Sequence, residues 1–270
     1  MNSVENDAAS ILAGAEEAKA AETFYRRYGK RIFDIVVALP LVIFTLPVNL
    51  VIAIVTFLDV GRPILFKQKR SGKDGKPITI VKFRNMRNTV DEDGFLLPAR
   101  QRVTRFGRFI RATSLDELLQ FWNVLFGTMS IIGPRPLGVA YMERYSPRHR
   151  MRLLVRPGLE CPMHVDLEHE RTWQDQLEND VWYVQHVSFR ADVTMLLRLV
   201  RMVFDRRYAK NRAAALRGSF LGYKNGMVVS GFLSERDRLE KKITLLTQRY
   251  ERMCVEEDDN SSKAPPFWVG

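Results

Sequence analysis

The chain has 270 residues, of which 46% are hydrophobic, and a formal net charge of +11. This length and apolar content are enough to bury a core, which excludes a disordered chain. Its two cysteines, Cys161 and Cys254, lie too far apart for a metal or redox pair and argue against a disulfide framework. Most of the positive excess lies between Arg62 and Arg111, which predicts a polyanionic partner: nucleic acid, anionic lipid or a phosphorylated substrate.

An uncharged apolar segment follows an N-terminal leader, residues 1–28. The segment runs from Ile35 to Leu58 and, at ~1.5 Å per residue, is long enough to cross a ~30 Å hydrocarbon core. Glutamates precede it and no small-residue cleavage site follows it, so we expect a retained membrane segment and not a signal peptide. A nucleic-acid-binding protein has no use for such a segment, and no nucleic acid partner is expected.

Two prolines, Pro40 and Pro47, fall inside this segment, and each removes a helical hydrogen bond. Lysines and arginines flank both ends, whereas a helix that spans the membrane should show an imbalance that fixes its orientation. We therefore predict that residues 29–58 form a re-entrant membrane helix that bends at a proline and returns to the same face. A spanning helix with proline kinks is the alternative.

The next segment has the pattern of a β-hairpin. Two runs rich in β-branched and aromatic residues, Ile64–Lys69 and Ile78–Arg84, flank a turn that contains Gly72 and Gly75. Alternation places Lys82 and Arg84 on one face of the second strand, where they are either solvated edge charges or anion ligands.

An acidic pair, Asp116 and Glu117, lies in the stretch "TSLDELLQFWNVL". Ser114 and Glu117 have the spacing of a capping box at a helix start, which would explain both without any chemistry. The alternative is a catalytic pair, because an ionised aspartate can attack phosphorus when Mg²⁺ and basic side chains neutralise the developing charge. The available cations are Lys82, Arg84, Arg111 and Arg135, the last in a rigid "GPRP" turn.

The helix that follows the acidic pair, residues 118–126, carries apolar side chains around almost its whole circumference, which requires burial or contact with lipid. Farther on, "VTMLLRLVRMVFDRRYAKNR" is typical of a basic amphipathic helix at a membrane surface, or of an ordinary helix facing a core. The Asn225-Gly226 pair predicts a second hairpin. Residues 239–253 show a heptad pattern of about two repeats, which predicts a homo-oligomer contact or a partner helix, and an acidic tail follows.

Several motifs occur together in a fixed order: "KRIFDIVVALP", "GRPILFKQKRSGKDGKPITIVKFRNM", "RVTRFGRFIRATSLDELLQFWNVLFGTMSIIGPRP", "VRPGL" and "ENDVWYVQHVSFRADV". In this order and spacing they resemble the bacterial sugar transferase family, the monotopic phosphoglycosyl transferases, over about residues 29 to 205. The resemblance implies that a sugar 1-phosphate passes from a UDP-sugar to a polyprenol phosphate, undecaprenyl phosphate, with release of UMP. It also implies the cytoplasmic face of a bacterial inner membrane and the start of exopolysaccharide, capsule or O-antigen synthesis.

The resemblance also implies roles for individual residues. Asp116 matches the nucleophile that takes up the phosphosugar, and Glu117 its neighbour that assists with Mg²⁺ or the lipid phosphate. The remaining matches are phosphate-binding cations, an acidic residue linked to the nucleotide site and the proline of the membrane break: Lys82, Arg111, Arg135, Asp180 and Pro47. The stretch "LECPMHVDLEHE" departs from the family pattern, so sugar recognition is expected to differ there.

The sequence thus predicts an α-rich α+β protein in four parts. These are the leader (1–28), a re-entrant membrane helix (29–58), a cytoplasmic catalytic domain (59–205) with surface amphipathic helices and a small hairpin, and a C-terminal extension (206–270). The predicted function is phosphoglycosyl transfer. The alternative is a non-catalytic or weakly active membrane-surface protein that binds anionic lipid and recruits partners for glycan assembly.

Overall fold

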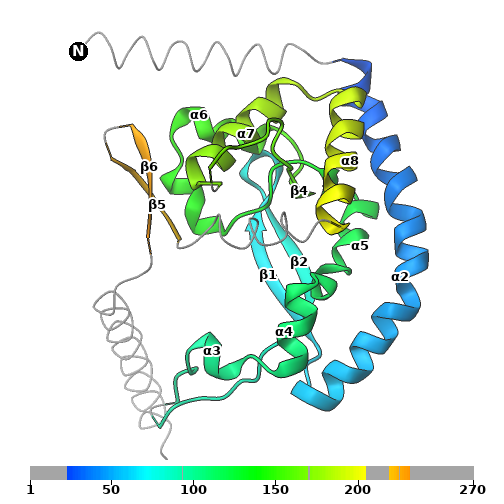
Figure 1. The fold of residues 1–270 in the computed structure, drawn as a ribbon, viewed down its shortest axis with the longest axis vertical. Coiled ribbons are helices and arrows are strands. Elements are labelled where there is room, and N and C mark those ends of the chain that lie inside the picture. The colour runs from blue at the N-terminus through cyan, green and yellow to red at the C-terminus, as the bar shows by residue number, and fades with distance from the viewer. Residues whose placement is uncertain (1–22, 93, 170, 205–218, 225, 232–270) are drawn as a thin grey trace, which may run out of the picture.

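The structure is a computed structural model that describes residues 23–92, 94–169, 171–204, 219–224 and 226–231 (Figure 1). The predicted leader up to residue 22, the heptad segment 239–253 and the acidic tail lie outside the described residues. Within the described part of the chain, helices predominate and the strands form three two-stranded sheets. A helix-rich fold with small sheets, as predicted, is confirmed.

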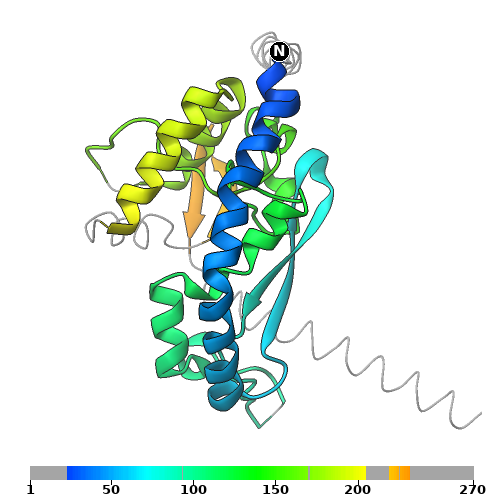
Figure 2. The same ribbon diagram turned by 90° about the vertical axis from the view of Figure 1, so that its right-hand side faces the viewer.

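A long apolar helix, α2 (Lys30–Val60), follows a π-helical turn, η1 (Tyr25–Gly29). Both prolines lie inside α2 without ending it, and by length and composition the helix could cross a membrane. Figures 1 and 2 show α2 along one side of the other elements, with its axis turning toward them at its C-terminal end. The face that packs on them is buried from Asp34 to Val60, whereas the opposite face exposes large apolar side chains such as Phe44 and Leu58.

Both predicted hairpins are confirmed. Strand β1 (Leu65–Ser71) pairs antiparallel with β2 (Pro77–Phe83) around a 3₁₀ turn, η2 (Lys73–Gly75). Strands β5 (Ser219–Lys224) and β6 (Met227–Gly231) pair around a turn in which Gly226 has φ +77°, a conformation that glycine adopts without a Cβ penalty.

The segment between the first hairpin and the core contains short helices: α3 (Ala99–Arg102), α4 (Arg105–Ala112), η3 (Leu115–Glu117) and α5 (Gln120–Leu125). The predicted capping box is wrong. Ser114 is left-handed at φ +58° and its side chain caps nothing, because Glu117 bonds to distant cations instead. The acidic pair therefore occupies a 3₁₀ turn ahead of α5, and α5 is shorter than the predicted apolar helix.

The centre of the molecule is a short parallel pair, β3 (Ser130–Ile132) and β4 (Gly158–Glu160). The elements around it are η4 (Val139–Arg144), α6 (Pro147–Arg150), η5 (Met151–Leu154), α7 (Trp173–Gln185) and α8 (Phe189–Phe204). A buried apolar cluster joins Ala38 of α2 and Val124 of α5 to Ile131, Tyr183 and Met195. Helix α8 takes the place of the predicted basic amphipathic helix, with Met195 buried and Leu197 exposed.

Candidate active site

The two acidic side chains lie in different surroundings, although they are adjacent in the chain. Both Glu117 oxygens accept hydrogen bonds from Arg135, at 2.7 and 2.9 Å, and Oε1 also accepts from Lys82 Nζ at 2.6 Å. Asp116 is 5% exposed and has no ion pair within 4.0 Å among the described residues. The structure thus brings Lys82, Asp116, Glu117 and Arg135 together, and both cations pair with Glu117.

These surroundings shift the pKa values of the two carboxyl groups in opposite directions. Burial opposes ionisation of Glu117, but the charges of Arg135 and Lys82 outweigh it and lower the pKa to about 2. Burial, assisted by the charge of Glu117, raises the pKa of Asp116, although Lys82 and Arg111 oppose the shift. The ionised form is therefore less stabilised at Asp116 than at Glu117.

Asn85 holds the Asp116 carboxylate in place. Its side-chain Nδ2 donates to Asp116 Oδ2 at 2.9 Å. The backbone at Asn85 is packed tightly against α4, because a Cβ added at Gly107 would lie 2.1 Å from the Asn85 carbonyl oxygen. Asn85 is not among the residues predicted from the sequence, although it lies three residues beyond Lys82 at the end of the same hairpin, where its polar side chain was a local signal.

A buried network behind the site orients Arg135. Arg135 NH1 donates to the Leu159 carbonyl oxygen at 3.1 Å and approaches Glu160 at 3.3 Å. The Arg135 carbonyl oxygen in turn accepts from Arg152 at 2.7 Å, and Arg152 forms an ion pair with Asp180 at 2.9 Å. Asp180 is fully buried and is connected to Arg135 through Arg152.

The remaining predicted residues lie outside this cluster. Arg84 donates to the carbonyl oxygens of Val60, Pro63 and Met86, and so binds the C-terminal end of α2. Strand β2 ends at Phe83, which breaks the alternation that had placed Arg84 beside Lys82. Arg111, in the last turn of α4, acts on Asp116 through its charge, while Pro47 lies on the exposed side of α2.

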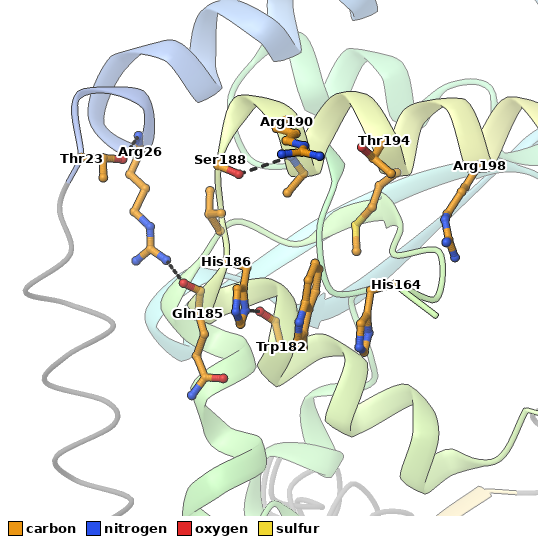
Figure 3. A pocket seen from close by; sticks show the side chains of 13 residues that line it. Thr23, Arg26, His164, Trp182, Gln185, His186, Ser188, Arg190, Thr194 and Arg198 are labelled. Carbon is orange, nitrogen blue, oxygen red and sulfur yellow. Dashed lines mark hydrogen bonds between the residues drawn. The ribbon is translucent and has the colours of Figure 1, made fainter. Parts of the chain in front are cut away.

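A cavity of about 190 Å³ adjoins the cluster and is lined by Arg135, Leu137, Arg152, Glu160, Arg171, Trp173 and Gln176. A second cavity, of about 470 Å³, shares none of these residues. Figure 3 shows it beneath α8, where Trp182 is stacked between His164 and His186. Arg135 both pairs with Glu117 and lines the smaller cavity, whereas the larger cavity is lined by none of the residues of the acidic cluster.

The acidic pair offers limited ligands to a metal ion. No group of three or more His, Cys, Asp or Glu side chains suited to a metal occurs within the described residues. Mg²⁺ needs fewer protein ligands than that, since it is commonly held by one or two carboxylates together with phosphate oxygens and water. Asp116 fits this role, whereas an ion bound by Glu117 would compete with Lys82 and Arg135.

Comparison with known proteins identifies the family. The family model described as bacterial sugar transferase matches residues 25–206. The chain is 41% identical over 174 residues to an uncharacterized sugar transferase of Bacillus subtilis, which covers 64% of this chain and 86% of that protein. It is 45% identical over 185 residues to the UDP-glucose:undecaprenyl-phosphate glucose-1-phosphate transferase of Escherichia coli, covering 59% of this chain and 38% of the relative.

A protein of the same name from Caulobacter vibrioides is 36% identical over 181 residues, which covers 63% of this chain and 68% of that relative. The chain thus spans most of the Bacillus protein but well under half of the Escherichia protein. The matched residues contain α2, the first hairpin, the acidic pair, Arg135 and α7. The chain belongs to the bacterial sugar transferase family.

Proposed function

We propose that the protein transfers a sugar 1-phosphate from a UDP-sugar to undecaprenyl phosphate and releases UMP. The observation that carries this proposal is the contrast within the acidic pair. Glu117 forms ion pairs with two cations, while Asp116 is buried beside them and forms no ion pair with any residue that the structure describes. An anionic phosphate drawn to Lys82 and Arg135 would therefore lie next to an available nucleophile.

The reaction has two displacement steps at one phosphorus atom. In the first, an Asp116 carboxylate oxygen attacks the sugar-bearing phosphorus, and the bond from phosphorus to the bridging oxygen breaks so that UMP leaves with that oxygen. In the second, a phosphate oxygen of undecaprenyl phosphate attacks the same phosphorus and breaks its bond to Asp116, which restores the carboxylate. In this proposal, Lys82, Arg111 and Arg135 offset the charge that develops; the support is that Lys82 and Arg135 bind the neighbouring Glu117 and that the charges of Lys82 and Arg111 act on Asp116.

The proposal includes Mg²⁺, held by Asp116 and by phosphate oxygens of the substrate. A bound Mg²⁺ supplies charge neutralisation at the reacting phosphate. The side chains of this protein orient the two carboxylates: Asn85 donates to Asp116 Oδ2, and Arg135 and Lys82 donate to Glu117.

We further propose that α2 is re-entrant, with the catalytic part on the cytoplasmic face of the membrane. The support is that both ends of α2 contact the same group of elements. Near its start, Arg31 donates to the carbonyl oxygens of Val124 and Leu125, and near its end Ile52 packs against Phe83 and Ile110. A helix that spanned the membrane would carry one of these ends to the opposite face.

Thiol labelling tests this topology. In a Cys254→Ser background, Arg27→Cys and Lys73→Cys place reporters at exposed positions before and after α2. A reagent that cannot cross the membrane should label neither in intact cells and both in inverted membrane vesicles. Labelling of one site in intact cells and of the other site in inverted vesicles would show a spanning helix.

Turnover tests the reaction. Membranes that contain the protein are supplied with UDP-sugars, undecaprenyl phosphate and Mg²⁺, and UMP release is compared between the native chain and Asp116→Asn. We expect release from the native chain alone, with Asp74→Asn as a control at an exposed aspartate. Equal release from Asp116→Asn, or none from the native chain with any sugar, would favour the non-catalytic alternative in which the basic surface binds anionic lipid.

A further inference from the structure

The β5–β6 hairpin lies beyond the residues that the family model matches, yet it contributes a fully buried side chain to the interior. The match ends at residue 206, and the two strands lie between residues 219 and 231. Phe220 is fully buried in a cluster with Tyr145, Trp173 and Leu177. Its ring is stacked on that of Tyr145, with 5.9 Å between the centroids and 22° between the planes. The hairpin is therefore packed into the molecule through an aromatic side chain.

Hydrogen bonds tie the hairpin to three neighbouring elements, η4, α6 and α7 (Figure 1). Arg144 of η4 donates to the Phe220 carbonyl oxygen at 2.8 Å. The N–H of Ser146, at the start of α6, donates to Tyr223 Oη at 3.2 Å. A backbone N–H of β6 donates to the side-chain oxygen of Gln174 on α7 at 3.1 Å. Because these bonds involve three separate elements, they define one docked orientation of the hairpin.

Tyr145 connects the aromatic cluster to the turn that carries Arg135. Its Oη accepts from Arg152 NH1 at 2.6 Å, and Arg152 NH2 donates to the Arg135 carbonyl oxygen at 2.7 Å. Leu137, two residues beyond Arg135, packs against the same cluster. The Arg135 side chain donates to both oxygens of Glu117. A continuous set of packed and hydrogen-bonded side chains thus joins the hairpin to the acidic pair.

Loss of the Phe220 ring would leave empty space beside Tyr145. Protein interiors are close-packed, and the side chains around a new cavity relax only in part. Tyr145 and the Arg152 guanidinium bonded to it would then have less defined positions, and so would the backbone at Arg135. Displacement of a group in an active site by about 1 Å can lower the rate about a hundredfold.

We propose that the β5–β6 hairpin positions the arginine of the candidate active site, with Phe220 acting through Tyr145 and Arg152 on the Arg135 turn. Phe220 is thus a positioning residue, since it acts through other side chains and not on the reacting atoms. The effect on turnover rests on the proposed function, whereas the effect on the order of the arginine turn does not. The competing account is that the hairpin only stabilises the fold.

Hydrogen exchange followed by mass spectrometry tests this on the full chain in detergent, without any substrate. Phe220→Ala should raise the exchange rates in η5, which carries Arg152, and in the peptide that contains Arg135 about tenfold or more, while those of α5 stay within about twofold. Phe220→Leu keeps most of the side-chain volume and should recover most of the protection. Leu221→Ala is the matched control, because Leu221 follows Phe220 on β5 and is 44% exposed.

Tyr145→Phe distinguishes positioning from general stability. It keeps the ring on which Phe220 is stacked and removes the acceptor of Arg152 NH1. If Phe220 acts through Tyr145, this variant should also raise exchange at the Arg135 peptide, and adding Tyr145→Phe to Phe220→Ala should raise it little further. Two independent contributions to stability would instead multiply in the double variant.

Three results overturn the proposal. The first is native exchange at the Arg135 peptide in Phe220→Ala, the second is an equal rise in α5, and the third is multiplied effects in the double variant. If Phe220→Ala fails to fold, Phe220→Leu and Tyr145→Phe decide the question, since both keep a large apolar side chain. Native exchange at the Arg135 peptide in both of these variants would then overturn the proposal.

Turnover measured in parallel separates this inference from the proposed function. In active preparations, Phe220→Ala should lower kcat for UMP release per folded molecule about tenfold, and Leu221→Ala should change it less than about twofold. An unchanged kcat in folded Phe220→Ala also overturns the positioning role. If the native chain releases UMP and exchange shows no coupling, the positioning role is wrong and the reaction stands. If exchange shows the coupling and no UDP-sugar yields UMP, the coupling stands and the reaction is wrong.

Discussion

Replacing Glu117 by glutamine removes the charge that Lys82 and Arg135 share. The pKa of this carboxyl falls from an ordinary 4.5 to about 2 in the folded chain, and at 1.36 kcal/mol per unit that shift corresponds to about 3 kcal/mol of stabilisation. Glu117→Gln should therefore lower the free energy of unfolding by about 3 kcal/mol, or the melting temperature by about 6 to 12 °C. Thermal unfolding in detergent at pH 7 measures this.

The same variant should change two pH dependences. Because the pKa of Glu117 is lower in the folded chain, its stabilisation is complete above about pH 4.5 and is lost as the pH falls toward 2. The stability of Glu117→Gln should not include this decrease between about pH 4.5 and pH 2. The charge of Glu117 also raises the pKa of Asp116, so in any active preparation of the variant the acidic fall in UMP release should move to lower pH.

Glu178→Gln is the control for both measurements. The pKa of Glu178 is also lowered to about 2, by His149 and Arg148, but Glu178 lies on α7 away from the acidic pair. It should lose some stability and leave the pH profile of UMP release unchanged. If Glu117→Gln melted at the native temperature and kept the native pH profile, the reasoning about the acidic pair would be refuted.

Two further predictions concern the side chains around Asp116 and Arg135. Asn85→Ala removes the donor at 2.9 Å from Asp116 Oδ2 and should lower kcat about tenfold or more, with little change in KM. Asn85→Gln should recover less than half of this loss. A rise in KM alone would contradict this role of Asn85. Arg152→Met leaves Asp180 buried without its partner and should lower the free energy of unfolding, measured by thermal unfolding, by about 3–5 kcal/mol. The double variant Arg152→Met with Asp180→Leu should be markedly more stable than Arg152→Met alone. Equal instability of the two variants would contradict a buried ion pair.

The hairpins could be predicted because their signals are local. Alternating β-branched residues and a glycine turn are read within about twenty residues, and both hairpins occur where the pattern placed them. The apolar segment that forms α2 could also be predicted from the sequence. Its path along the other elements depends on packing such as the buried cluster of Ile52, Phe83 and Ile110, which no local pattern contains.

The site was predicted less completely because its contacts cross long stretches of chain. Ser114 and Glu117 have the local spacing of a capping box, but Lys82, 35 residues away, and Arg135, 18 residues away, bind the glutamate instead. Asn85 carried no motif that pointed to a site. Its contact with Asp116 depends on the packing of the end of the first hairpin against the acidic turn, 31 residues farther along the chain.

In the proposed reaction, Asp116 becomes covalently bonded to the phosphosugar. The most direct measurement is peptide mass spectrometry of the full chain after incubation with a panel of UDP-sugars and Mg²⁺, without undecaprenyl phosphate. We expect one sugar phosphate on the peptide that contains Asp116, together with about one equivalent of UMP, and neither product from Asp116→Asn. Release of UMP only when undecaprenyl phosphate is present, with no modified peptide, would contradict a covalent intermediate at Asp116.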